Sequence, residues 1–420
     1  MVRSRGRIVN GASGSSASSL WLEFSTLGIR NLIPGLPNDL ACVCLACVPL
    51  WQHGRLRSVC RSWNAALSGD FIIQLRRKLG KGEEFLYLFR DDPSLCRGEV
   101  FDPRAQLWST FSPMPCNPSR YSMSNFECVA AGQQLYVLGG SLFDARNFPM
   151  DRPVASSSVF KYDPVRSQWE QCQDMKTPRG SFACGIFQGC LIVAGGGSRH
   201  AQFRAGGDRI CEAEKYDLAR DSWESLPGLH SIRAGCSGFF VGDEFWVLGG
   251  YGEARTISGV LPVDEHYNDG EVFSFGSGSW RKLEAMWEDG ERLRLGRIAV
   301  LYGDVDGLPS VFMLENSKLL RYDFGSNGWY PESELPSPLA AESSCRLVGL
   351  DGEVYVIPGG VNEQRYERSP RSWSRSTTRR CNILFQIYHP VKRTWRAVVT
   401  KPPLDHQHNP PWGAMCVMKL

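Results

Sequence analysis

Short apolar runs bounded by Gly, Pro, Asn, Asp or Ser recur along most of the chain from residue 84 onward. Runs of this length between turn-forming residues predict β-strands. Residues 179–223 give the fullest copy, which reads R-G-S-F-A-C-G-I-F, then C-L-I-V-A-G-G-G after a Q-G turn, and finally E-K-Y-D-L-A-R-D-S-W. Such a unit holds four runs, so we expect a series of four-stranded antiparallel meanders.

One spacing is constant in these copies, because an aromatic residue is always followed by a tryptophan seven positions later. Successive tryptophans lie 61, 54, 57, 49 and 66 residues apart, so the outer spacing varies while the inner spacing is fixed. Self-similarity at about 50 residues indicates a propeller or a repeat array rather than one layered domain. The pairs are Phe101/Trp108, Tyr162/Trp169, Tyr216/Trp223, Phe273/Trp280, Tyr322/Trp329 and Tyr388/Trp395.

Glycine pairs close the predicted second strand of four copies, where the chain needs positive φ or a close backbone approach. Together with the Tyr-Asp dipeptide and the tryptophan that follow, they resemble the kelch repeat over residues 85–420, which implies a β-propeller. The copy that ends at Trp329 departs from this pattern, since Glu315-Asn316 replaces its glycines. The pairs are Gly139-Gly140, Gly195-Gly196, Gly249-Gly250 and Gly359-Gly360.

The first copy lacks its first strand. Residues 84–89 match a second strand, whereas residues 412–420 resemble a lone first strand. We therefore expect a mainly β fold in which residues 81–420 form a six-bladed kelch-type β-propeller. The strand at 412–420 would complete the first blade and so remove an unpaired sheet edge.

Residues 32–80 have helical periodicity. Pro37-Asn38-Asp39 is a typical helix start, Pro49 ends this helix, and residues 71–79 predict another one. Two apolar stripes at helical spacing lie between these signals: Leu40, Val43, Cys44 and Cys47, and then Leu56, Val59, Cys60 and Trp63. A three-helix unit of this size has little stability alone, so it is either a cap on the propeller or a module that binds a partner.

The residues of this helical unit resemble the F-box: Leu-Pro-x-Asp-Leu at 36–40, a helix, a proline, and Leu-Arg-x-Val-Cys-Arg-Ser-Trp at 56–63. An F-box followed by kelch repeats resembles the plant F-box/kelch-repeat proteins. That resemblance implies a non-enzymatic adaptor, in which residues 32–80 dock on a Skp-family adaptor that joins a cullin, and the propeller holds a target protein for ubiquitination. The alternative is a non-ligase kelch scaffold or cytoskeletal interaction protein. The implied docking face, or its supporting core, consists of Leu36, Pro37, Leu40, Leu56, Val59 and Trp63.

An arginine recurs at the start of the predicted first strands, on the face that carries the long loops at about 141–157, 197–211, 251–270 and 361–381. Guanidinium groups around one opening favour carboxylate or phosphate ligands, so these arginines predict an acidic or phosphorylated target. The alternative is that they fix the turn between blades. They are Arg120, Arg179, Arg233 and Arg297.

Two segments fall outside the repeats. Residues 1–31 are basic and Ser/Gly-rich, which predicts a disordered tail, with an organelle transit peptide as the alternative. Residues 364–380 hold six arginines and one glutamate. This loop is either a solvated insertion or a regulatory loop that loses positive charge on phosphorylation.

The composition argues against several other classes of function. A net charge of +3 gives no general affinity for nucleic acid, and the longest apolar run, 40–51, is too short to span a membrane. Fifteen scattered cysteines favour reduced, buried thiols and a cytoplasmic or nuclear protein. Cys42, Cys44 and Cys47 share no helical face, and His406 and His408 are an equally weak signal, so we expect no metal, cofactor or catalytic site.

Overall fold

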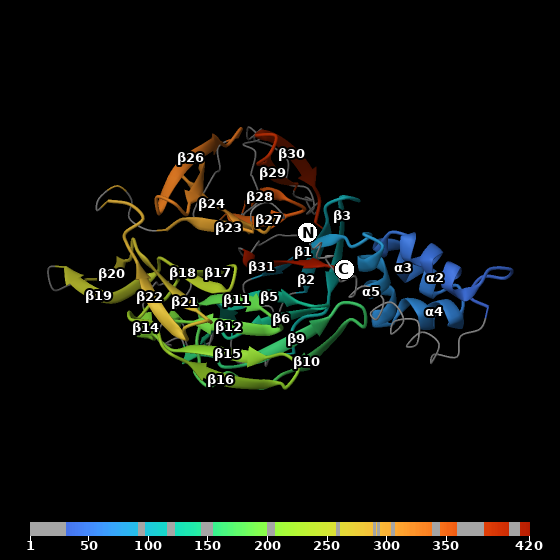
Figure 1. Ribbon diagram of the computed structural model, residues 1–420, viewed down its shortest axis with the longest axis horizontal. Helices are drawn as coiled ribbons and strands as arrows, with labels where there is room; N and C mark the ends of the chain where they lie inside the picture. The colour runs from blue at the N-terminus through green and yellow to red at the C-terminus, as the bar shows by residue number, and fades with distance from the viewer. Residues whose placement is uncertain are drawn as a thin grey trace, which may run out of the picture. The chain divides into compact units, whose positions relative to one another are not determined.

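The computed structural model (Figure 1) divides into two compact units, one reaching to Glu83 with Lys419–Leu420 added, the other spanning Glu84–Met418. The structure describes residues 31–90, 97–115, 122–143, 154–199, 206–257, 261–288, 291, 295–303, 307–337, 345–358, 382–402 and 412–420. The predicted basic tail, Arg120, Gly359-Gly360 and the arginine-rich loop at 364–380 lie outside these residues.

The described part of the first unit is helical. Its helices are α2 (Asn38–Cys47), α3 (Leu50–Arg57), α4 (Arg61–Leu67) and α5 (Asp70–Lys78), with α2 packed on α5 and α3 on α4. The prediction that residues 56–63 form one helical stripe is wrong. A turn at 58–60 separates α3 from α4, and the Cys60 sulfur accepts a hydrogen bond from the Trp63 amide at 3.4 Å, which caps α4.

Helix α2 buries a different face from the one that the sequence pattern indicated. Its buried residues are Ala41, Cys42, Leu45 and Ala46. Leu40, at the start of the predicted stripe, is 50% exposed, and Cys44 and Cys47 are exposed as well. Small Ala and Cys side chains favour a close approach to α5, because the separation of packed helices depends on the side chains at their contact. The apolar stripe therefore points away from the core of this unit.

In the second unit, the described strands form six four-stranded sheets of antiparallel, blade-like form. Each follows the expected order of first to fourth strand, and in the first sheet the strand beside β1 is β31, from the C-terminal end of the chain. The sheets, in order, are β31 (Trp412–Lys419), β1 (Glu84–Arg90), β2 (Gly98–Asp102) and β3 (Leu107–Phe111); β5 (Glu127–Ala131), β6 (Gln134–Leu138), β9 (Val159–Asp163) and β10 (Gln168–Gln171); β11 (Ala183–Phe187), β12 (Cys190–Ala194), β15 (Ala213–Asp217) and β16 (Ser222–Leu226); β17 (Ser237–Val241), β18 (Glu244–Leu248), β21 (Gly270–Ser274) and β22 (Ser279–Leu283); β23 (Arg297–Leu301), β24 (Ser310–Glu315), β25 (Lys318–Asp323) and β26 (Gly328–Glu334); β27 (Arg346–Leu350), β28 (Glu353–Ile357), β29 (Ile383–His389) and β30 (Thr394–Thr400).

Three of the predicted long loops carry short strands of their own. These make small sheets from β4 (Ser122–Ser124), β7 (Ser141–Phe143) and β8 (Val154–Ala155), from β13 (Gly197–Arg199) and β14 (Gly206–Arg209), and from β19 (Tyr251–Ile257) and β20 (Leu261–His266). Each small sheet includes the segment that joins a second strand to a third strand. The loop face of these three sheets is thus partly ordered by backbone pairing.

The turn between third and fourth strands explains the constant spacing of seven. In all six sheets the aromatic residue and its tryptophan are direct cross-strand partners, with ring centroids 4.9–5.2 Å apart. The residue five positions after the aromatic one always has positive φ, between 49° and 67°. A turn with one left-handed residue cannot change length without losing this register. The left-handed residues are Gln106, Ser167, Asp221, Gly278, Asn327 and Arg393.

The indole N–H of these tryptophans reaches from each sheet to the preceding one. Trp169 donates to the Ser112 carbonyl at 3.0 Å, Trp223 to Gln173 at 2.9 Å and Trp280 to Pro227 at 2.6 Å. Trp395 donates to Ser333 Oγ at 2.8 Å, and Trp108 of the first sheet donates to Thr400 Oγ1 of the sixth at 2.5 Å. Trp329, in the degenerate copy, is the exception: among the described residues its buried N–H has no acceptor. There the Asn327 amide donates instead, to the Glu284 carbonyl at 3.0 Å.

This exception gives a matched pair of variants. Trp223 and Trp329 are both 8% exposed and both face a tyrosine, but only Trp223 makes the bond to the preceding sheet. Trp223→Phe leaves the Gln173 carbonyl without its donor, so we expect it to lower the free energy of unfolding by about 1–3 kcal/mol more than Trp329→Phe does. Urea unfolding of the two variants measures the difference. Equal losses would show that the indole bond contributes nothing.

Candidate functional site

The helical unit exposes apolar side chains that a core would normally bury. Leu40 on α2 is 50% exposed, Trp51 on α3 is 44% exposed and Val59, in the turn before α4, is 61% exposed. Pro37 is exposed at the start of α2. Of the predicted docking residues, Leu40, Pro37 and Val59 are therefore the ones most available to a partner. Trp51 was missed, although an aromatic residue beside Pro49 at the start of a helix was visible in the sequence.

The other three predicted docking residues are partly buried. Leu36 and Leu56 have intermediate exposure. Trp63 does too, and its indole N–H donates to the Leu32 carbonyl at 2.7 Å, which ties the segment before α2 to helix α4. These side chains support the exposed ones rather than project from the surface.

A buried ion pair organises the rest of this unit and was not predicted. Arg76 on α5 is 1% exposed and donates to the carbonyls of Ala46 and Val48 at the end of α2, at 2.7 and 2.5 Å. Its second nitrogen donates to Glu83 Oε2 at 2.8 Å. Because a helix ends in carbonyls that lack intrahelical donors, Arg76 both satisfies α2 and fixes it against α5.

Beside this ion pair, His53 on α3 is fully buried, with Nε2 3.1 Å from the Val48 carbonyl. Burial, with further contributions from Arg76 and Arg57, lowers the pKa of His53 to about 4. The imidazole is therefore neutral in the folded unit at neutral pH.

In the second unit, two of the predicted arginines are buried and fully engaged. Arg179, just before β11, donates to Glu214 Oε1 at 2.6 Å and to the carbonyls of Gly195 and Glu212 at 2.8 Å. Glu214 in turn accepts the amides of Lys176 and Thr177. Arg179 thus joins the start of its first strand to the second and third strands of the same sheet.

Arg233, just before β17, repeats this arrangement one sheet later. It donates to Glu271 Oε1 at 3.0 Å, to Asp269 Oδ1 at 2.7 Å and to the Gly249 carbonyl at 3.0 Å, and its guanidinium lies 4.5 Å from the centre of the Tyr267 ring. Neither arginine side chain has exposed surface. These contacts match the alternative role, in which the arginines fix the turns between sheets.

Opposing influences act on the two guanidinium groups. Burial lowers the pKa of Arg179, with Glu214 acting against it. At Arg233, burial also acts to lower the pKa, but Asp269 and Glu271 outweigh it and the pKa is raised. Both arginines remain charged at physiological pH. Loss of Glu214 would therefore leave Arg179 buried without a carboxylate partner, and loss of Arg233 would leave Glu271 buried without its guanidinium partner.

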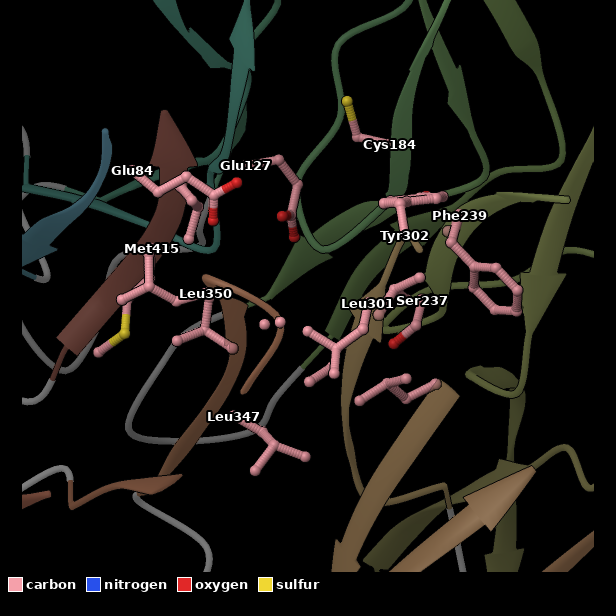
Figure 2. Close-up of a pocket in the computed structure, with 18 of the residues that line it drawn as sticks. Glu84, Glu127, Cys184, Ser237, Phe239, Leu301, Tyr302, Leu347, Leu350 and Met415 are labelled. Atoms are coloured by element: carbon pink, nitrogen blue, oxygen red, sulfur yellow. The ribbon is translucent and has the colours of Figure 1, made fainter. Parts of the chain in front are cut away.

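Arg297 has a different environment. It begins β23 and is exposed. Close by, a cavity of about 520 Å³ is lined by residues from the first strand of every sheet, as Figure 2 shows. Each of these strands has a labelled lining residue there: Met415, Glu127, Cys184, Phe239, Leu301 and Leu347 are examples, one from each strand.

The polar group that stands out in this cavity is Glu127. Burial raises the pKa of Glu127 to about 7, and the charges of Arg346 and Arg297 partly offset this rise. Arg346 is also bound to the C-terminal strand, because its guanidinium donates to the Gly413 carbonyl at 2.7 Å. The cavity thus has a mixed polar and apolar lining, and the charges of Arg346 and Arg297 act on the acidic Glu127 there.

Two features are absent from the described residues. No group of three or more His, Cys, Asp or Glu side chains could hold a metal ion there. No helix in that part of the chain is long and apolar enough to cross a membrane.

The arginine geometry predicts contrasting effects of substitution. Arg233→Ala leaves Glu271 buried without its cation, so we expect a loss of about 3–5 kcal/mol in the free energy of unfolding. Arg297→Ala, at an exposed position, should cost less than Arg233→Ala does, because Arg297 is not enclosed with a buried carboxylate as Arg233 is. Chemical denaturation of both variants measures this. A stable Arg233→Ala protein would contradict the structural role.

The buried His53 predicts that the stability of the helical unit depends on pH. Its pKa is lower in the folded state than the ordinary value of 6.5, so the unfolded chain binds the proton more tightly. Stability is therefore complete above about pH 6.5 and falls as the pH drops toward 4, by about 2 kcal/mol at pH 5. Thermal unfolding followed by helical circular dichroism at pH 7.5 and 5 measures the loss. His53→Gln should have a smaller loss between the two pH values, and an equal loss would assign the effect to other groups.

Comparison with known proteins agrees with both units. The F-box domain matches residues 33–72, which hold α2 to α4 and the start of α5, and the Kelch motif matches residues 122–176 and 178–230, which hold the second and third sheets. F-box/kelch-repeat protein OR23 of Arabidopsis thaliana is 40% identical over 413 residues, which cover 93% of this chain and 92% of that protein. F-box/kelch-repeat protein SKIP30 of the same plant is 36% identical over 226 residues, which cover 52% of this chain and 61% of that protein. The resemblance seen in the sequence is thereby confirmed, and the chain belongs to the F-box/kelch-repeat protein family.

Proposed function

We propose that this chain is the target-recognition subunit of a Skp–cullin–F-box type ubiquitin ligase. The observation that carries the proposal is the F-box match, which falls on a separate helical unit with outward-facing Leu40 and Val59. Burial of such side chains on a partner is favourable by about 25 cal/mol per Å² of apolar surface. A small helical unit that leaves them exposed is suited to dock on a Skp-family adaptor.

Docking would use Leu40, Pro37 and Val59 directly. Leu36, Leu56 and Trp63 would hold these residues in place, since they are partly buried within the unit. Arg76 would add rigidity by fixing the end of α2. A preformed surface of this kind loses less conformational entropy on binding than a flexible one.

We further propose that the six sheets are the blades of a closed six-bladed propeller. The position of β31 beside β1 and the bond from Trp108 to Thr400 both support closure between the first and sixth sheets. A closed ring leaves no long unpaired inner edge. It would give the loops of one face a rigid base for binding a target protein.

The target would bind on this loop face, where Arg297 is exposed and able to pair with an acidic or phosphorylated segment. Arg179 and Arg233 would not contact the target but would hold in place the strand ends that carry this face. The chain would act by proximity, because holding target and ligase in one complex raises their effective concentration. Other subunits would carry out the transfer of ubiquitin, and the complex would act in the cytoplasm or nucleus.

Direct binding tests the adaptor role. Purified full-length chain is expected to bind a purified Skp-family adaptor and, through it, a cullin. The double variant Leu40→Glu/Val59→Glu places two charges on the docking face and should weaken adaptor binding more than 10-fold. Both positions are exposed, so the fold should be retained. Calorimetric titration of adaptor into each protein measures the affinities.

Val391→Glu is the matched control, because Val391 is 89% exposed in the second unit; it should bind as well as the unmodified chain. If the double variant also binds normally, the docking residues are wrong. If the unmodified chain fails to bind any Skp-family adaptor, the ligase role is wrong and a non-ligase kelch scaffold takes its place.

A further inference from the structure

Two cysteines far apart in the sequence meet where the C-terminal strand lies next to the second sheet. Cys416 is in the middle of β31, and Cys128 is the second residue of β5. Their sulfur atoms are 2.9 Å apart, although 288 residues separate them. Both are free thiols. Approach by about 0.9 Å would bring the two sulfurs to the length of a disulfide bond.

The pair lies on two strands that also line the cavity of the second unit. The chain neighbours Glu127, Met415 and Val417 line it, and Figure 2 shows the first two of these side chains there. Because successive side chains of a strand point to opposite faces, Cys128 and Cys416 lie on the other face of β5 and β31. Cys416 is 7% exposed, whereas Cys128 has intermediate exposure, so a small oxidant would reach the pair at Cys128.

We propose that Cys128 and Cys416 form an oxidation site at which hydrogen peroxide converts the two thiols into a disulfide that fixes the C-terminal strand to the second sheet. In the first step one sulfur attacks the peroxide, so an S–O bond forms, the O–O bond breaks and water leaves. The second thiol then attacks the sulfenic sulfur; the S–S bond forms, the S–O bond breaks and a second water leaves with the thiol proton. Two thiols are oxidised, and one peroxide is reduced to two waters.

The surroundings make this reaction slow but selective. Burial raises the pKa of Cys128 well above its ordinary value, and the adjoining Cys416 thiol, Glu127 and Cys184 act in the same direction. Since the thiolate is the reactive form, few thiols react at neutral pH in a short exposure. Proximity then decides the product, because a sulfenic acid at either position has the other thiol as its nearest partner.

The disulfide would act on the strand that completes the first sheet. In the reduced chain β31 is held by its sheet pairing and side-chain contacts. The disulfide would add a covalent bond to β5 and close a loop of most of the chain, which restricts the unfolded state. This inference is independent of the ligase function.

The experiment uses the full-length chain. After incubation with hydrogen peroxide, the remaining thiols are blocked with a maleimide, and the chain is digested and analysed by mass spectrometry. We expect a reducible cross-linked peptide that joins Cys128 to Cys416, together with a rise of roughly 5 °C in the melting temperature, reversed by dithiothreitol. Cys416→Ala and Cys128→Ala should each abolish both effects.

Cys190→Ala is the matched control, since Cys190 on β12 is a free thiol of intermediate exposure and should leave the link intact. The cross-linked peptide is measured in the unmodified chain, so the test does not depend on the folding of a variant. Recovery of Cys128 and Cys416 only as separate peptides would overturn the proposal. A link without any rise in melting temperature would overturn its stabilising role.

Discussion

The second unit depends on one contact made repeatedly: a tryptophan that packs at a tilted angle against its cross-strand aromatic partner and donates its indole N–H to the sheet before it. The ring contact fixes the third and fourth strands of a sheet, while the hydrogen bond fixes that sheet to its neighbour. Between the sheets, apolar clusters such as the one holding Tyr136, Leu191 and Trp223 exclude water around these bonds. Where the contact is incomplete, at Trp329, an asparagine side chain makes the connection instead.

A second constraint fixes the loop face. Buried ion pairs at Arg179 and Arg233 hold the start of a first strand against the end of the second strand in their own sheets. An arginine that recurs before a strand has the same sequence signal whether it anchors a turn or binds a ligand. The two roles are distinguished by how deeply the arginine is buried and by which groups it contacts. For Arg179 and Arg233, these contacts are with Glu214 and Glu271, which meet the arginines only in the folded sheet.

The sequence was most informative where one residue type has one physical role. The aromatic-to-tryptophan spacing predicted the strand pairs because a turn with a left-handed residue has fixed length. It was least informative in the helical unit. Leu40 and Cys44 form a stripe that looks like a core face, yet α2 buries the neighbouring face with Leu45 and the small residues Ala41, Cys42 and Ala46, which allow a close approach to α5. The Arg76–Glu83 ion pair had no sequence signal, since its partners come together only after α5 packs on α2.

The family assignment and the two units together describe a chain with an F-box unit that exposes apolar side chains and a second unit of six four-stranded sheets. The first of these sheets is completed by β31. Hydrogen–deuterium exchange of the β1 amides, in the full chain and in a chain that ends at residue 411, tests this most directly. We predict that the β1 amides are protected in the full chain and that the ones facing β31 exchange rapidly in the shortened chain. Equal protection of β1 in both chains would contradict the account.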